Sequence, residues 1–241
     1  MTFCYISPRG GLHPARLCHN PRVHSIRRRE LALAMVLAAI AGYLDAVGFL
    51  HLGGFFVSFM SGNTTRAAAN AASGDWVQAG RAAGLIGLFF FGVVAGSVLS
   101  RFAHGRVVVL WATTGIVGCS ALAQSLGVGV PAILVISVAM GVLNATFQRG
   151  GEVSIGLTYM TGTLVKAGQR LVDGFFGGSR TAWLRYLAMW IALSAGAIAG
   201  AYAYTSIPDA VLWIAAGGLL LATSVTTIVR RRSVLTATDA E

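Results

Sequence analysis

The chain has 241 residues, of which 56% are hydrophobic and only 11% are charged, and its mean hydropathy is +0.72. Because soluble domains carry about 25% charged residues, this composition excludes a water-soluble globule and indicates an integral membrane protein. The net charge of +10 does not indicate nucleic-acid binding, since arginines gather at the ends of apolar runs, at residues 27–29 and 230–232, rather than along a soluble face.

The apolar runs predict an all-α, polytopic helical bundle. The first expected span covers residues 31–50, and a polar-mixed segment follows at 55–72. Further spans are expected at 82–100, at 107–126 and from Pro131, where proline suits a first helical turn. A second polar-mixed segment covers 153–172, and the last two spans are expected at 182–203 and 209–229. Each apolar run approaches or exceeds the roughly 18 residues that mark a spanning helix.

This order repeats after about one hundred residues. AGYLDAVGF at 41–49 aligns with MGVLNATFQ at 140–148, and FMSGNTTR at 59–66 aligns with YMTGTLVK at 159–166. VLWATTG, starting at Val109, aligns with VLWIAAG, starting at Val211. We therefore predict two membrane repeats, residues 29–127 and 128–230, between a disordered basic extension at 1–28 and a polar tail at 231–241.

Two topologies fit the charges, and both place the two termini in the cytoplasm of a cell-membrane protein. Six full spans plus two short, broken segments give inverted halves, with Arg66 and Arg81 outside and the other sixteen Lys and Arg residues inside. Eight crossings give parallel halves, with Arg101, Arg106 and Arg149 outside and the other fifteen inside. We favour six spans because the stretch SGNTTR is too polar to face lipid.

The stretches AGYLDAVGFLHLGGFFVSFMSGNTTR and GVLNATF…YMTGTLVK resemble the YoaK-like family of small bacterial multi-pass membrane proteins, over roughly residues 31–230. The Gly-Tyr-Leu-Asp-Ala and Ser-Gly-Asn parts carry the resemblance, and Ser61 stands where that family often has Thr. The function of the family is unknown, so the resemblance implies a membrane fold but no reaction and no site.

The two polar segments predict helix breaks at Gly62 and Gly162. A bilayer leaves no peptide group unpaired, so a break is tolerated only where protein buries it or where it lines a wet cavity. One interpretation is a solute site between the breaks; the other is that Gly and hydroxyl side chains let helices pack closely. The residues predicted to line such a site are Asp45, Ser61, Asn63, Thr64, Asn144, Thr161 and Thr163.

Three charged residues are candidates for ion chemistry. Asp45 lies in an apolar run, where a carboxylate costs about 2.5–3.5 kcal/mol, so it either couples a proton or cation or reaches headgroup water. Arg66 and Lys166 each follow their motif glycine by four residues and either attract an anion toward the breaks or extend to the interface.

The sequence favours a small secondary transporter or channel for a small solute or ion. The alternative is a non-transporting membrane scaffold or accessory subunit. Enzymatic, cofactor-binding and metal-binding motifs are not apparent, and we expect none of these activities. The expected partners are the lipid bilayer, a possible solute, and a possible second copy of the chain through the helix-packing glycines Gly92, Gly96, Gly196 and Gly200.

Overall fold

The structure is a computed structural model that describes residues 28–102, 105–149, 152–153 and 156–238. Apart from Arg28, the predicted basic extension lies outside the described residues. The described chain forms α1 (Arg28–His51), α2 (Met60–Ala72), α3 (Trp76–Leu99), α4 (Gly105–Ser125), α5 (Gly129–Leu143), η1 (Asn144–Phe147), β1 (Gln148–Arg149), β2 (Glu152–Val153), α6 (Met160–Phe175), α7 (Ala182–Ser206), η2 (Pro208–Ala210) and α8 (Val211–Thr238).

Six of these segments are long and apolar enough to cross a membrane, and they contain α1, α3, α4, α5, α7 and α8. The two remaining helices are shorter: α2 has 13 residues and α6 has 16. At 1.5 Å per residue they measure only about 20 and 24 Å, against a hydrocarbon core of about 30 Å. The prediction of a helical membrane bundle with six full spans and two short segments is therefore confirmed.

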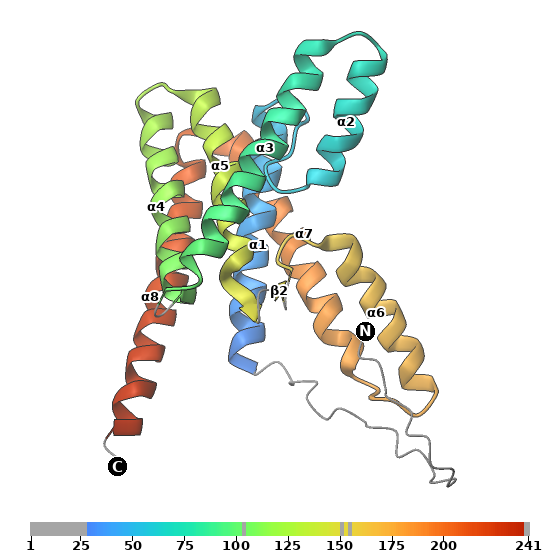
Figure 1. The fold of residues 1–241 in the computed structure, drawn as a ribbon, viewed down its shortest axis with the longest axis vertical. Coiled ribbons are helices and arrows are strands. Elements are labelled where there is room, and N and C mark those ends of the chain that lie inside the picture. Colours follow the sequence, from blue (N-terminus) through green and yellow to red (C-terminus); the bar gives the residue numbers. More distant parts are fainter. Residues whose placement is uncertain (1–27, 103–104, 150–151, 154–155, 239–241) are drawn as a thin grey trace, which may run out of the picture.

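The two short helices lie at opposite ends of the bundle (Figure 1). The start of α1 and the end of α8 share the lower end in this view, where α6 forms a hairpin with α7. The α2–α3 hairpin extends from the upper end. A short antiparallel pair, β1 with β2, leads from η1 toward α6 and places Arg149 opposite Glu152.

The closest helix contacts join segments that are far apart in sequence. Helix α1 packs along α7, and α3 packs along α5. A Cβ atom at Gly92 would overlap the carbonyl oxygen of Val138, and a Cβ at Gly196 would overlap that of Ala39. These glycines therefore let the backbones of the paired helices approach directly.

All four helix-packing glycines are buried in such contacts within the chain; Gly96 lies against Val142 and Gly200 against Tyr43. These glycines therefore pack α3 against α5 and α7 against α1 within the chain. A homo-oligomer stays a prediction.

The buried core lies where α1, α4, α5, α7 and α8 meet. Two hydrogen bonds cross it: the Tyr43 hydroxyl donates to the Val211 carbonyl oxygen at 2.9 Å, and the hydroxyls of Thr114 and Thr223 are 3.0 Å apart. Large apolar side chains on the outer faces of α3, α7 and α8 remain exposed and are available for contact with lipid.

The boundaries of α3 and α8 differ from the predicted spans by more than five residues. Helix α3 begins at Trp76 rather than 82, because the carboxylate of Asp75 accepts a hydrogen bond from the Gln78 amide at 3.1 Å and caps the helix. Helix α8 continues to Thr238, so the predicted polar tail at 231–241 begins inside a helix.

Candidate functional site

The connection from α1 to α2 is held by Asp45. Its Oδ1 accepts hydrogen bonds from the amides of Val57 at 2.9 Å and Ser58 at 2.8 Å. The chain turns back after α1 because Gly53 and Gly54 adopt positive φ angles of 67° and 97°, a region that favours glycine. The carboxylate therefore satisfies backbone groups that the break between α1 and α2 leaves free.

Asn63 completes this arrangement from the first turn of α2. Its side chain is fully buried, its Oδ1 accepts from the Phe56 amide at 3.0 Å, and its Nδ2 donates to the Phe56 carbonyl at 2.7 Å. One amide side chain thus pairs both backbone groups of a residue that belongs to no helix.

The second half has a related but weaker arrangement. The Thr158 hydroxyl donates to Asn144 Oδ1 at 3.3 Å, and Asn144 Nδ2 donates to the Met140 carbonyl at 2.9 Å. Asn144 and Thr158 stand at positions that align with Asp45 and Ser58 in the predicted repeat. Each short helix is therefore preceded by a contact between the end of a long helix and the segment that leads into the short one.

The glycines predicted as breaks are not the breaks. Gly62 is the third residue of α2 and Gly162 the third residue of α6, so both lie inside helical turns. Gly62 packs against the rings of Phe56 and Phe59, whereas a Cβ at Gly162 would meet no atom within 4 Å. The breaks lie earlier, at residues 52–59 and in the segment that precedes Met160.

The remaining predicted residues lie on exposed surfaces. Ser61, Thr64, Thr161 and Lys166 are exposed. The hydroxyls of Thr64 and Thr163 donate to carbonyls one turn earlier in their own helices, at 2.9 and 2.8 Å. In the described part of the chain, no hydrogen bond or ion pair joins Ser61, Asn63 or Thr64 to Thr161 or Thr163. The hydrogen bonds of these residues stay local to their own polar segment.

Arg66 packs against an aromatic ring at the break between α1 and α2. Its guanidinium lies 4.7 Å from the centre of the Phe55 ring, and its Nε is buried without a hydrogen-bond partner. A cation over an aromatic face is a stabilising arrangement that also reduces contact with water.

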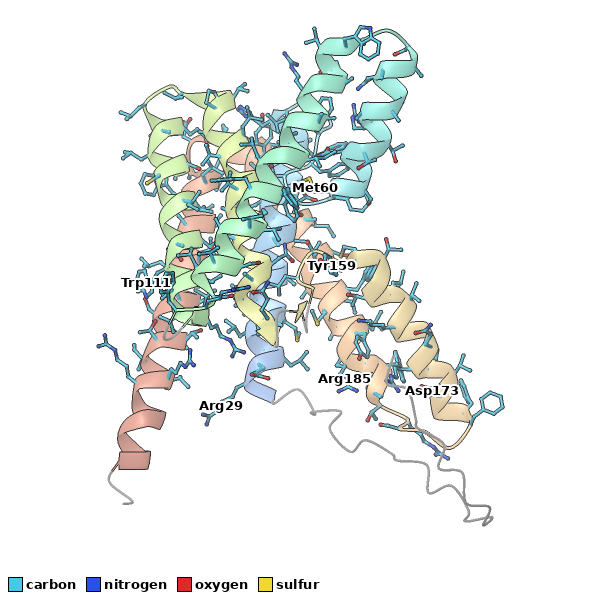
Figure 2. The ribbon with its side chains drawn as sticks, in the orientation of Figure 1. Arg29, Met60, Trp111, Tyr159, Asp173 and Arg185 are labelled. Carbon is cyan, nitrogen blue, oxygen red and sulfur yellow. The ribbon has the colours of Figure 1, made fainter. Side chains whose placement is uncertain are left out.

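A large cleft lies elsewhere, at the end where α1 begins and α8 ends. It has a volume of about 1760 Å³ and is formed by α1, the end of α3, the start of α4, η1 and α8. Arg29, labelled in Figure 2 at the foot of α1, is one of its residues. Four arginines and one glutamate line the cleft: Arg29, Arg101, Arg106, Arg230 and Glu30.

A polar network builds one wall of this cleft. Arg106 donates to Glu30 Oε1 at 3.2 Å and to the Thr146 carbonyl at 3.3 Å, and it lies 5.0 Å from the centre of the Phe147 ring. The Ser100 hydroxyl donates to Gln148 Oε1 at 2.7 Å, and Gln148 Nε2 donates to the Ser97 hydroxyl at 2.9 Å. These contacts tie α1, α3, α4 and η1 together.

The side chain of Thr146 stands out in this network. It is 3% exposed and lines the cleft, and its hydroxyl has no hydrogen-bond partner. Sequence reasoning missed this cleft, because its residues come from positions 29 to 230 and have no common motif. Within the described ranges, no group of three or more His, Cys, Asp or Glu residues could hold a metal ion.

Comparison with known proteins places this architecture in a family. A family model described as "Protein of unknown function (DUF1275)" matches residues 33–225, which is most of the six-span bundle. The chain belongs to this DUF1275 family. It is also 34% identical over 215 residues to the UPF0700 transmembrane protein RA0705 of Rhizobium meliloti (strain 1021), a match that covers 88% of this chain and 93% of the relative.

No solved structure matches this DUF1275 protein. The resemblance to a family of multi-pass membrane proteins of unknown function is confirmed by both matches. Neither description names a reaction or a ligand.

Proposed function

We propose that this protein is a small secondary transporter or channel for a small solute or ion. The observation that carries the proposal is the pair of short helices: α2 and α6 begin at intermediate levels of the bundle and run to opposite ends (Figures 1 and 2). Met60 and Tyr159, at the starts of these helices, are labelled in Figure 2. Half-helices whose amino ends point into a bundle are how many transporters present positive dipole ends to a solute.

The proposal includes an inverted internal repeat. Its support is the correspondence between contacts: Gly92 meets Val138 on α5, and Gly196 meets Ala39 on α1. Position 39 aligns with 138 and position 92 with 196, so each contact is the counterpart of the other. The pairs α1 with α7 and α5 with α3 are then equivalent interfaces, each joining the first long helix of one half to the third helix of the other.

The orientation follows from charge. The four cleft arginines flank membrane spans at the end shared by the start of α1 and the end of α8. Because Lys and Arg concentrate in cytoplasmic loops, we place this end and both termini in the cytoplasm, with the protein in the cell membrane.

Reconstitution tests the proposal. Purified protein in liposomes is screened for flux of inorganic ions, amino acids and small organic anions, with empty liposomes as the control. We expect movement of at least one class. Absence of flux across the whole screen, with protein shown to be folded and correctly inserted, would contradict transport.

Asp45 is the proposed ion-coupling residue, and the variant Asp45→Asn can be compared with a matched control variant. Asp45→Asn keeps an oxygen that can accept the Val57 and Ser58 amides but removes the ionisable group, as Asn144 does naturally in the other half. We expect flux to lose its dependence on a proton or cation gradient. Asp75→Asn, at the exposed cap of α3, should leave it unchanged.

A scaffold or accessory subunit is the second candidate. It is favoured by one observation: Asp45, Asn63 and Asn144 all use their polar atoms on the chain's own backbone and side chains. Copurification of a stoichiometric membrane partner in mild detergent, together with a negative flux screen, would favour this function over transport.

A further inference from the structure

The arginines of the cleft lie at the depth of lipid headgroups. Arg29 and Arg106 are the first and second residues of their membrane spans, Arg230 is the second-last residue of its span, and Arg101 follows Leu99, the last residue of the α3 span, by two positions. Among the described residues that line the cleft, these four arginines face one carboxylate, that of Glu30, so this lining carries an excess of positive charge where the hydrocarbon core meets headgroups.

Arg106 is held ready to bind an oxyanion. Its hydrogen bonds to Glu30 and to the Thr146 carbonyl, and its position over the Phe147 ring, fix the plane of the guanidinium. These two hydrogen bonds use two of its five N–H groups. Glu30 thus positions this arginine without neutralising the cleft.

The Thr146 hydroxyl is a second, independent sign of a ligand. This hydroxyl is buried without a partner, it belongs to a residue that lines the cleft, and the carbonyl of the same residue accepts from Arg106. A ligand oxygen can accept its proton once the side chain rotates toward the cleft, and the unpaired hydroxyl favours that exchange.

The deeper wall of the cleft is apolar. Val36 on α1 and Leu221 and Val225 on α8 line it and are 48%, 69% and 59% exposed. They lie five to nine residues inward from Arg29 and Arg230, which is about 8–14 Å along a helix, at the depth of acyl chains. A free phosphate or a small polar anion would leave this wall uncovered.

We propose that the cleft binds the phosphate headgroup of an anionic phospholipid, with an acyl chain along the apolar wall between α1 and α8. The phosphate accepts hydrogen bonds from Arg106 and Thr146, and the outer arginines supply the long-range attraction. This lipid site does not include Asp45 or the short helices. A test of lipid binding is therefore independent of a test of transport.

Lipid titration tests the proposal. Purified full-length protein in a non-ionic detergent is titrated with short-chain phosphatidylglycerol and phosphatidylcholine, and bound lipid is counted by native mass spectrometry. We expect one saturable phosphatidylglycerol site with clear preference over phosphatidylcholine. Arg230→Gln should weaken phosphatidylglycerol binding roughly fivefold, the effect of one basic residue near a membrane surface.

Arg231→Gln is the matched control, because the neighbouring residue lies on the same helix at almost the same depth but does not line the cleft. We expect it to change the affinity by less than twofold. Equal losses in both variants would mean that only general surface charge attracts the lipid, and they would overturn the site.

Thr146→Val tests the hydroxyl without removing a contact inside the protein. We expect weaker phosphatidylglycerol binding and an unchanged or higher melting temperature for the lipid-free protein, with binding rescued in Thr146→Ser. Undiminished binding in Thr146→Val would overturn the assigned headgroup position. Displacement of the lipid by glycerol phosphate alone would reassign the cleft to a soluble phosphate and overturn the lipid assignment.

Discussion

Asn63 illustrates how single polar side chains hold a broken backbone inside an apolar bundle. The residue pairs both backbone groups of Phe56 and is itself fully buried. Thr64, its neighbour, is exposed and bonds only within α2. Both residues are polar members of the stretch SGNTTR, but only Asn63 pairs with backbone groups outside its own helix.

Replacing Asn63 by Ala should therefore destabilise the protein strongly. The Phe56 amide and carbonyl would each lose their partner, at a cost of about 1–3 kcal/mol per buried group. Thr64→Ala is the matched control and should stay within about 0.5 kcal/mol of the parent. Thermal unfolding of both variants in detergent measures the difference; equal melting temperatures would show that the break is held by other contacts.

The sequence predicted that polar residues in the two segments are important for structure or function. It did not predict where these residues lie relative to the breaks. The sequence predicted that Asp45, Asn63 and Asn144 line a solute site, and in the structure all three hold backbone or side-chain partners of the chain itself. It misplaced the breaks at Gly62 and Gly162, because a glycine beside hydroxyl residues looks like a turn. The turn at the first break is made by Gly53 and Gly54, which lie between the predicted span at 31–50 and the polar-mixed segment at 55–72.

At the scale of elements, α3 contains glycines with opposite roles. Gly92 faces the backbone of α5, where a Cβ would overlap Val138, whereas Gly84 faces open space in the same helix. The sequence spacing of Gly92 and Gly96 predicted a close helix contact but could not identify which helix makes it. The identity of the partner helix depends on which helices of the two predicted halves pack against each other.

Gly92→Ala and Gly84→Ala form a matched pair for this contact. Gly92→Ala should destabilise the protein by about 1–3 kcal/mol, since the α3–α5 backbones must separate. Gly84→Ala should be neutral or stabilising by up to about 1 kcal/mol, because alanine favours a helix more than glycine does. Unfolding by denaturant in mixed micelles distinguishes them, and a neutral Gly92→Ala would contradict the α3–α5 contact.

At the scale of the whole molecule, the cleft exists only because α1, α3, α4, η1 and α8 converge at one end. Its residues lie up to about two hundred positions apart, so no local pattern in the sequence predicts it. The six spans were predictable for the opposite reason, since each depends only on a continuous apolar run. Local hydrophobicity therefore identified the elements, and tertiary packing created the cleft.

Because α3 spans the membrane, the α2–α3 turn and the α3–α4 connection lie on opposite sides, and the side of each depends on whether α2 crosses or returns. The direct test is membrane-impermeant labelling of single cysteines at positions 73 and 101, both exposed, in a background in which Cys4, Cys18 and Cys119 are replaced by Ser. Six spans with inverted halves predict that Ser73→Cys is labelled from outside intact cells and that Arg101→Cys is labelled only after the membrane is opened. With both termini in the cytoplasm, the reverse pattern, protection at 73 with labelling at 101, would mean eight crossings and would contradict the inverted architecture.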